Sequence, residues 1–136
     1  MFLLDTNVLA ELRTNKPQAS QAVRAWASQQ PLHRLYLSAV SLMELEIGVQ
    51  RMERKDPLQG AYLRAWAQQA VERFEDRVLP ISERTALICA GLHVPDPRPL
   101  GDSMIAATAL EHGLTVVTRN VADFSGTGVK IHNPWN

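Results

Sequence analysis

Four acidic residues stand at positions where a carboxylate could do chemistry. Asp5 directly follows the apolar run Phe2–Leu4, and Asp123 follows a β-prone segment. Glu44 and Asp102 belong to otherwise apolar stretches with helical spacing. Hard divalent cations prefer oxygen ligands, and Mg²⁺ takes one or two carboxylates together with waters and substrate phosphate. Such a carboxylate set would suit the metal-assisted attack of water on a phosphodiester.

Each of these carboxylates also has a purely structural interpretation. Asp5 and Asp102 could cap helices by accepting backbone N–H bonds, as aspartate commonly does at helix N-termini. Glu44 could be solvated, although its neighbour Glu46 is the better candidate for that, and Asp123 could be a turn residue. Taken one at a time, the structural roles are the more frequent ones, and periodicity alone does not decide between them.

The remaining reactive side chains do not indicate another kind of site. The histidines lack zinc-like spacing, so surface or core roles are expected for His33, His93, His112 and His132. The single cysteine, Cys89, excludes an internal disulfide and fits a reducing compartment, so the cytoplasm is the expected location. Metal-assisted water attack requires no histidine and should leave a 5′-phosphate and a 3′-hydroxyl.

Length and charge leave the function open. The chain has 136 residues, enough for one hydrophobic core, and we expect a single domain over residues 1–136. No stretch resembles a signal peptide or a membrane span. Fourteen basic residues balance fourteen acidic ones. This balance counts mildly against a nucleic-acid binder that relies on its overall field, but not against an enzyme whose bound cations contact phosphate.

Strands and helices are expected to alternate along the chain. The predicted strands are Phe2–Leu4, Leu35–Ser38, Val78–Ile81, Thr115–Thr118 and, more weakly, Val129–Ile131. Apolar residues at helical spacing predict six helices. These are Val8–Leu12, a helix beginning near Pro17 with Ala19, Val23 and Trp26 inward, Leu42–Met52, Leu63–Phe74, a helix from a Ser82 cap to Leu92, and a helix from Asp102 to a Gly113 cap.

This alternation predicts a parallel sheet covered by helices. In such sheets, ligands bind at the carboxyl ends of the strands. Asp5 follows the first strand directly, and Asp123 follows the Thr115–Thr118 strand after a short loop. These two carboxylates are therefore expected to meet.

The order of the segments resembles the PIN-domain family, and within it the VapC toxin nucleases of bacterial toxin–antitoxin pairs, especially the FitB-like branch. The resemblance covers essentially the whole chain. It is carried by Asp5-Thr6-Asn7, Glu44–Gly48, Gly101–Ala107, Thr118–Asn120 followed by Asp123-Phe124, and the ending Gly128–Trp135. The most specific parts are the opening Asp-Thr-Asn and the block from Asp102 to Asp123.

This resemblance implies a three-layer α/β/α sandwich with a central, mainly parallel sheet and a metal-dependent ribonuclease activity. One acidic pocket would bind Mg²⁺ or Mn²⁺ through Asp5, Glu44, Asp102 and Asp123. Polar support would come from Asn7, Thr118 and Asn120. Arg119, beside the pocket, is a candidate for a contact with RNA phosphate, although a solvated or structural arginine is equally compatible with the sequence.

The resemblance also implies two protein partners. One is an antitoxin, whose apolar segment would lie across the helices, and the other is a second copy of the chain in a homodimer. Any exposed part of the Trp66 face, or of the helix Leu45–Met52, could receive the antitoxin. Packing in the core is the first expectation for Trp26, Trp66, Leu63 and Phe74.

Three other function classes share part of the pattern. A phosphatase of the haloacid-dehalogenase type also begins with aspartate after its first strand, but it needs a second aspartate where this chain has Asn7. An acidic binding module without enzyme activity gives no reason for the fourth carboxylate, Asp123. A structure-specific DNA nuclease uses the same carboxylate chemistry, but such enzymes usually need added helices, for which this chain has little room.

Overall fold

The computed structural model describes all residues from 1 to 136 and is built on a five-stranded sheet in the order β3-β2-β1-β4-β5. Every pair of neighbouring strands is parallel. The strands are β1 (Phe2–Leu4), β2 (Leu35–Ser38), β3 (Val78–Leu79), β4 (Thr115–Val117) and β5 (Ile131–His132). The expected parallel sheet is confirmed, and β1 lies at its centre.

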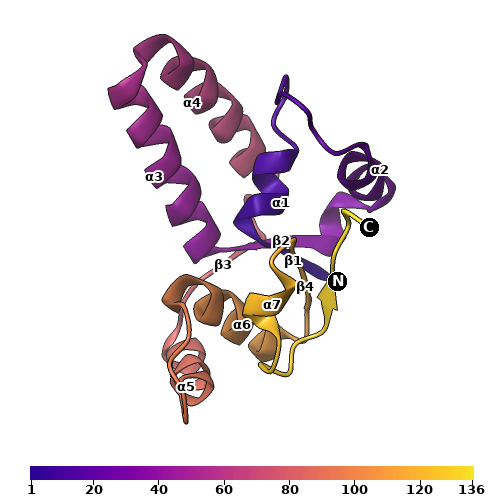
Figure 1. The fold of residues 1–136 in the computed structure, drawn as a ribbon, viewed down its shortest axis with the longest axis vertical. Helices are drawn as coiled ribbons and strands as arrows, with labels where there is room; N and C mark the ends of the chain where they lie inside the picture. Colours follow the sequence, from indigo (N-terminus) through magenta and orange to yellow (C-terminus); the bar gives the residue numbers. More distant parts are fainter.

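Helices cover both faces of this sheet, with α1 to α4 on one side and α5 to α7 on the other (Figure 1). Their bounds are α1 Thr6–Glu11, α2 Gln21–Gln29, α3 Ala39–Lys55, α4 Pro57–Glu72, α5 Glu83–Leu92, α6 Leu100–His112 and α7 Val121–Phe124. A short 3₁₀ helix, η1, spans Leu32–Arg34 and precedes β2. The three-layer α/β/α arrangement predicted from the family resemblance is confirmed.

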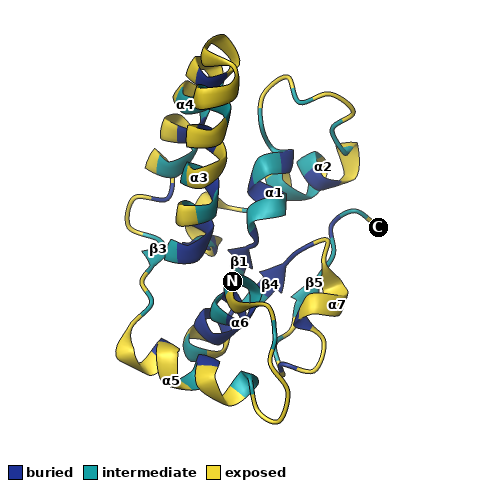
Figure 2. Cartoon of the chain, turned by 60° about the vertical axis from the view of Figure 1, so that its left-hand side comes forward, coloured by how far each residue is buried: buried dark blue, intermediate teal, exposed yellow.

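Two apolar clusters fill the space between the layers. Successive residues of β1 face opposite sides, so Leu4 joins the cluster under α1 to α4, and Leu3 joins the cluster under α6 and α7. Both leucines are fully buried, as expected for a central parallel strand. Figure 2 shows the buried residues gathered on the sheet and on the inward faces of the helices. No helix combines the length and the apolar character needed to cross a membrane.

Several element boundaries differ from the sequence predictions, most clearly the start of α2 and the end of β3. Helix α2 begins at Gln21, after a Ser20 cap, so the prediction that it begins near Pro17 was wrong. The backbone takes left-handed conformations at Asn15 and Gln18, which a helix cannot continue through. Strand β3 stops at Leu79 because Pro80 has no N–H for the ladder.

At the C-terminal end, the last strand begins two residues later and ends one residue later than predicted, as its pairing with β4 shows. Val116 pairs with Ile131 and Val117 with His132. Asp123, expected in a loop, lies instead within the short helix α7.

Candidate active site

Asp5 is held at the carboxyl end of β1 by hydrogen bonds to both of its carboxylate oxygens. Its Oδ1 accepts the backbone N–H of Thr6 at 2.7 Å, which makes Asp5 the N-cap of α1. Its Oδ2 accepts the Thr118 hydroxyl at 2.7 Å and the Asn7 amide at 3.3 Å. The residue is 4% exposed. Asp5 is therefore both a helix cap and a fixed carboxylate at the sheet edge.

Thr118 connects the two central strands at this edge. Because β1 and β4 are neighbours in the sheet, Thr118 reaches Asp5 across 113 residues of sequence. Its hydroxyl oxygen also accepts the backbone N–H of Asn120 at 3.0 Å and the Asn7 amide at 3.4 Å. The side chains of Asn7 and Thr118 thus surround Asp5, whereas Asn120 takes part through its backbone.

Glu44 comes from α3, and a hydroxyl that the sequence analysis did not single out fixes its carboxylate. The Thr6 hydroxyl donates to Glu44 Oε1 at 2.6 Å. Gly101, at the start of α6, adds a close approach, since a Cβ there would lie 3.3 Å from Glu44 Oε2. Glu46 turns elsewhere and pairs with Arg64 of α4 at 2.6 Å. Of the two glutamates, Glu44 is therefore the one that faces Asp5.

Asp102 lies in the first turn of α6 but does not cap it. The N-cap of this helix is Pro99, and no side chain caps its N-terminus. The capping interpretation of Asp102 was therefore wrong. The turn is held instead by Ser103, whose hydroxyl donates to the Leu100 carbonyl at 2.9 Å and lies 2.8 Å from His93 Nε2. The Asp102 carboxylate is left free of a backbone role.

The four carboxylates are close enough to influence one another electrostatically. The pKa of Asp102 is raised to about 6, and burial is the largest cause. The charges of Asp5, Asp123 and Glu44 and a hydrogen bond with Asp123 raise it in the same direction. Burial also raises the pKa of Asp5, assisted by Glu44 and Asp123, against the opposing hydrogen bonds from Thr118 and Thr6. We refer to these four electrostatically coupled carboxylates as the acidic pocket, and none of them has a salt-bridge partner.

The donor set fits a hard divalent cation. All four groups offer carboxylate oxygens, and no cysteine or histidine is among them. In this structure, however, no group of three or more such side chains is gathered closely enough to hold an ion by itself. Mg²⁺ tolerates this arrangement because it usually keeps several waters and binds through only one or two carboxylates and substrate phosphate.

Neutralising Asp102 is expected to stabilise the metal-free protein at neutral pH. Because the pKa of Asp102 is raised by folding, the folded state holds this proton more tightly, and stability falls as pH rises from about 4 through about 6. At pH 7.5 in EDTA, Asp102→Asn should gain about 1–2 kcal/mol after allowing for partial solvent exposure. The measurement is the free energy of unfolding of both proteins at pH 5 and pH 7.5. An equal difference at both pH values would contradict the assignment.

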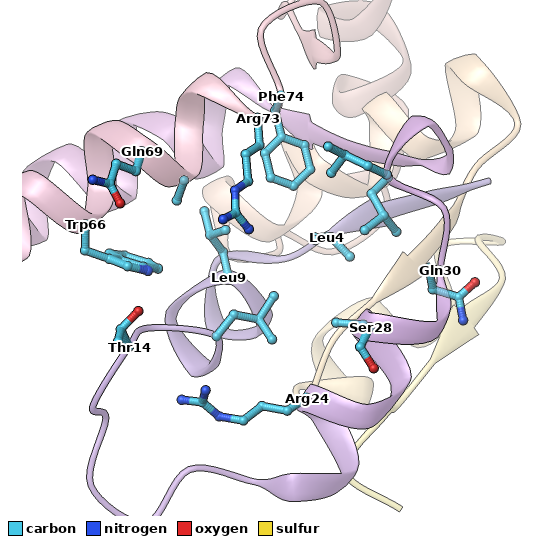
Figure 3. A pocket seen from close by; sticks show the side chains of 15 residues that line it. Leu4, Leu9, Thr14, Arg24, Ser28, Gln30, Trp66, Gln69, Arg73 and Phe74 are labelled. Atoms are coloured by element: carbon cyan, nitrogen blue, oxygen red, sulfur yellow. The ribbon is translucent and has the colours of Figure 1, made fainter.

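A separate groove lies elsewhere on the molecule. This groove of about 370 Å³ runs between α1, α2 and α4, and none of the four carboxylates lines it. Trp66 and Phe74 line it from the α4 side, Leu9 from α1, and Arg24 from α2 (Figure 3). Trp66 is half-buried, whereas Leu45 and Val49 of α3 are core residues. Ile47 of the same helix is 40% exposed, however, so both surfaces considered for an antitoxin present apolar side chains to solvent.

Comparison with known proteins agrees with this architecture. The model of the PIN domain family matches residues 2–128. Toxin FitB from Neisseria gonorrhoeae is 35% identical over 100% of this chain and 99% of its own length. VapC ribonuclease Y4jK from Sinorhizobium fredii is 35% identical over 99% of this chain and 98% of its own. A toxin–antitoxin complex from Klebsiella pneumoniae contains a chain that is 27% identical, with a TM-score of 0.70 over 100% of this chain and 99% of that one. The chain therefore belongs to the PIN-domain family.

Proposed function

We propose that this protein is a metal-dependent endoribonuclease that acts as the toxin of a type II toxin–antitoxin pair. The observation that carries the proposal is the pocket formed by Asp5, Glu44, Asp102 and Asp123, whose negative charges no basic side chain compensates. A pocket of this kind is costly for the fold unless a cation binds, and functional sites often hold like charges together in this way. The names of the relatives, a ribonuclease and a toxin, support the same function.

In this proposal the four carboxylates bind the metal, and neighbouring threonines orient two of them. The four carboxylates would hold Mg²⁺ or Mn²⁺, which supplies an activated water and stabilises the charge that develops in an in-line displacement. Thr118 and the Thr6 backbone orient Asp5, and the Thr6 hydroxyl orients Glu44. In this proposal water rather than the RNA 2′-hydroxyl is the nucleophile, so the products should carry 5′-phosphates.

The groove lined by Trp66 is the proposed docking surface for the antitoxin. It is apolar along Leu9, Trp66 and Phe74, which suits the apolar segment that the family resemblance implies. Arg24 adds a polar requirement, because its Nε atom is buried without a hydrogen-bond partner while its other end donates to the Arg13 carbonyl at 2.7 Å. An antitoxin segment with an acceptor at this position would complete the hydrogen bonds of Arg24.

Exposed apolar side chains on α3, α5 and α6 support the proposed homodimer. Met43 of α3 is 51% exposed, Leu87 of α5 is 69% exposed, and Leu100 of α6 is 61% exposed. A continuous apolar patch that includes such side chains would be a candidate subunit interface. Light scattering on the purified protein measures the molar mass in solution directly.

Overproduction of the protein without an antitoxin is expected to arrest bacterial growth. Asp5→Asn should relieve the arrest because it removes a pocket charge while retaining an acceptor for the Thr6 N–H. Glu46→Gln is the matched control, since Glu46 pairs with Arg64 outside the pocket, and it should arrest growth as the parent does. Growth curves and protein levels are recorded for all three. An intact protein that is harmless in a strain without a cognate antitoxin would contradict the toxin assignment.

A further inference from the structure

Arg119 is an arginine whose donors are free although its position is fixed. It follows Thr118 directly, and its backbone N–H donates to Asn7 Oδ1 at 3.4 Å. The guanidinium lies 5.3 Å from the centre of the Trp135 ring. It is exposed and makes no hydrogen bond or salt bridge. By contrast, the guanidinium of Arg64 is bound by two carboxylates, and that of Arg98 by two carbonyls.

Trp135 is itself held in place by the sheet. The β4–β5 pairing continues beyond the strands, where the Thr118 N–H donates to the His132 carbonyl at 3.0 Å. At the next residue, Asn133 Oδ1 accepts the Trp135 backbone N–H at 2.9 Å and turns the chain. The half-buried indole packs against the larger apolar cluster. Arg119 therefore stacks on a ring that rests on the core.

The carboxylate of Glu11, whose pKa the charge of Arg119 helps to lower, forms no salt bridge with Arg119. Glu11 is buried, and its carboxylate accepts the Ser20 backbone N–H at 3.0 Å and pairs with Lys16 at 3.0 Å. The Ser20 bond is the largest cause that lowers the pKa of Glu11, followed by Lys16, and the charge of Arg119 contributes least. The charge of Arg119 thus affects the pKa of Glu11, but the guanidinium N–H groups of Arg119 remain available to a ligand.

We propose that Trp135 is a positioning residue for RNA binding, because its indole holds the Arg119 guanidinium at the rim of the acidic pocket, where it contacts a phosphate beside the scissile bond. This inference rests on the proposed ribonuclease function. The four carboxylates repel RNA phosphates, so a cation at the rim has an electrostatic task. A planar guanidinium binds phosphate through two parallel N–H bonds, and stacking on the ring reduces the freedom that is lost on binding.

The chain offers a matched control for this pair. Arg34 stacks on Phe2 in the same manner, with its guanidinium 5.6 Å from the ring centre, and it is also exposed. It precedes β2 and lies over the first residue of β1, at the amino ends of the strands. The proposed pocket is at the carboxyl ends. Loss of Arg34 removes the same charge and the same kind of contact, but far from the pocket.

The test uses a fluorescein-labelled single-stranded RNA of mixed sequence. Its Kd is measured by anisotropy in the Asp5→Asn background over a range of salt concentrations, and KM and kcat for RNA cleavage are measured with intact Asp5. Arg119→Ala should raise Kd and KM about 10-fold and reduce the slope of log K against log salt by about 0.7. Trp135→Ala should raise KM about 2- to 5-fold with little change in kcat. Trp135→Phe should retain most of the affinity, and Arg34→Ala should behave as the parent.

Melting curves show whether Trp135→Ala remains folded. If it does not, the double-mutant cycle of Arg119→Gln and Trp135→Leu decides, because leucine keeps an apolar side chain but removes the ring, and additive effects on Kd would overturn the proposal. An unchanged KM in Arg119→Ala or in folded Trp135→Ala would overturn it as well. Weaker antitoxin binding by Arg119→Ala would not rescue the proposal, because the proposal concerns RNA. In all these cases the parent still cleaves RNA. If the parent neither binds nor cleaves RNA, the proposed function itself fails, and this inference fails with it.

Discussion

Removal of divalent cations is expected to abolish RNA cleavage, and Mg²⁺ or Mn²⁺ should restore it. The pocket of Asp5, Glu44, Asp102 and Asp123 brings negative charges together, and none of these carboxylates has a salt-bridge partner that would offset their repulsion of an RNA phosphate. A metal that activates water and stabilises the developing charge contributes several kcal/mol to the transition state, so excess EDTA should reduce the rate at least about 100-fold. The measurement is the cleavage of labelled RNA, with analysis of the product ends.

The product ends separate this mechanism from its main competitor. Attack by a metal-bound water leaves a 5′-phosphate, and a substrate with a single 2′-deoxy sugar at the scissile position should still be cut if it binds. Attack by the 2′-hydroxyl would instead leave a 2′,3′-cyclic phosphate and require no metal. Full activity in excess EDTA, or cyclic phosphate ends, would rule out the proposed mechanism.

Neutralising a single pocket carboxylate should have an effect of similar size without unfolding the protein. Even residues that only support metal ligands commonly cost 10- to 100-fold in activity when they are lost, so Asp5→Asn and Asp102→Asn should reduce single-turnover cleavage at least about 100-fold. Asparagine at position 5 still accepts the Thr6 N–H, so α1 keeps its cap. The effect is therefore expected on the chemistry rather than on the fold.

Glu44 and Glu46, two positions apart on α3, supply the matched pair of variants for this experiment. Glu44→Gln changes a carboxylate that Thr6 orients toward the pocket, whereas Glu46→Gln changes one that Arg64 holds on the α4 side. Cleavage should fall strongly in the first and stay within about two-fold of the parent in the second, because an exposed ion pair contributes little. Equal activity of the Asp102→Asn variant and the parent would remove Asp102 from the site.

Much of the fold was predictable because its signals are local. The short apolar strands and the helical stripes identified the alternating elements, and the rule for parallel sheets placed Asp5 and Asp123 at the same edge. The start of α2 was not predictable in this way. It depends on the left-handed backbone of Asn15 and Gln18 and on the contact between the buried Glu11 and the Ser20 N–H. Sequence spacing contains no signal for either feature.

The choice between chemically similar groups in the pocket required the tertiary structure. Glu44 and Glu46 have the same side chain two positions apart, and they are distinguished by Thr6 on α1 and Arg64 on α4. Asp102 resembled a helix cap until the structure showed that α6 begins at Leu100, after Pro99. The sequence singles out Thr6 only as part of the Asp5-Thr6-Asn7 motif, although its hydroxyl spans 38 residues of sequence to reach Glu44.

Binding of Mn²⁺, followed by electron paramagnetic resonance of the free ion, tests the central claim most directly because it does not depend on the choice of an RNA sequence. The parent protein should deplete the free Mn²⁺ signal, and Mg²⁺ should displace the bound ion. Asp5→Asn and Asp102→Asn should weaken binding at least about 10-fold, whereas Glu46→Gln should bind as the parent does. A parent that binds no Mn²⁺, or pocket variants that bind it as tightly as the parent, would contradict the assignment of these carboxylates to a metal site.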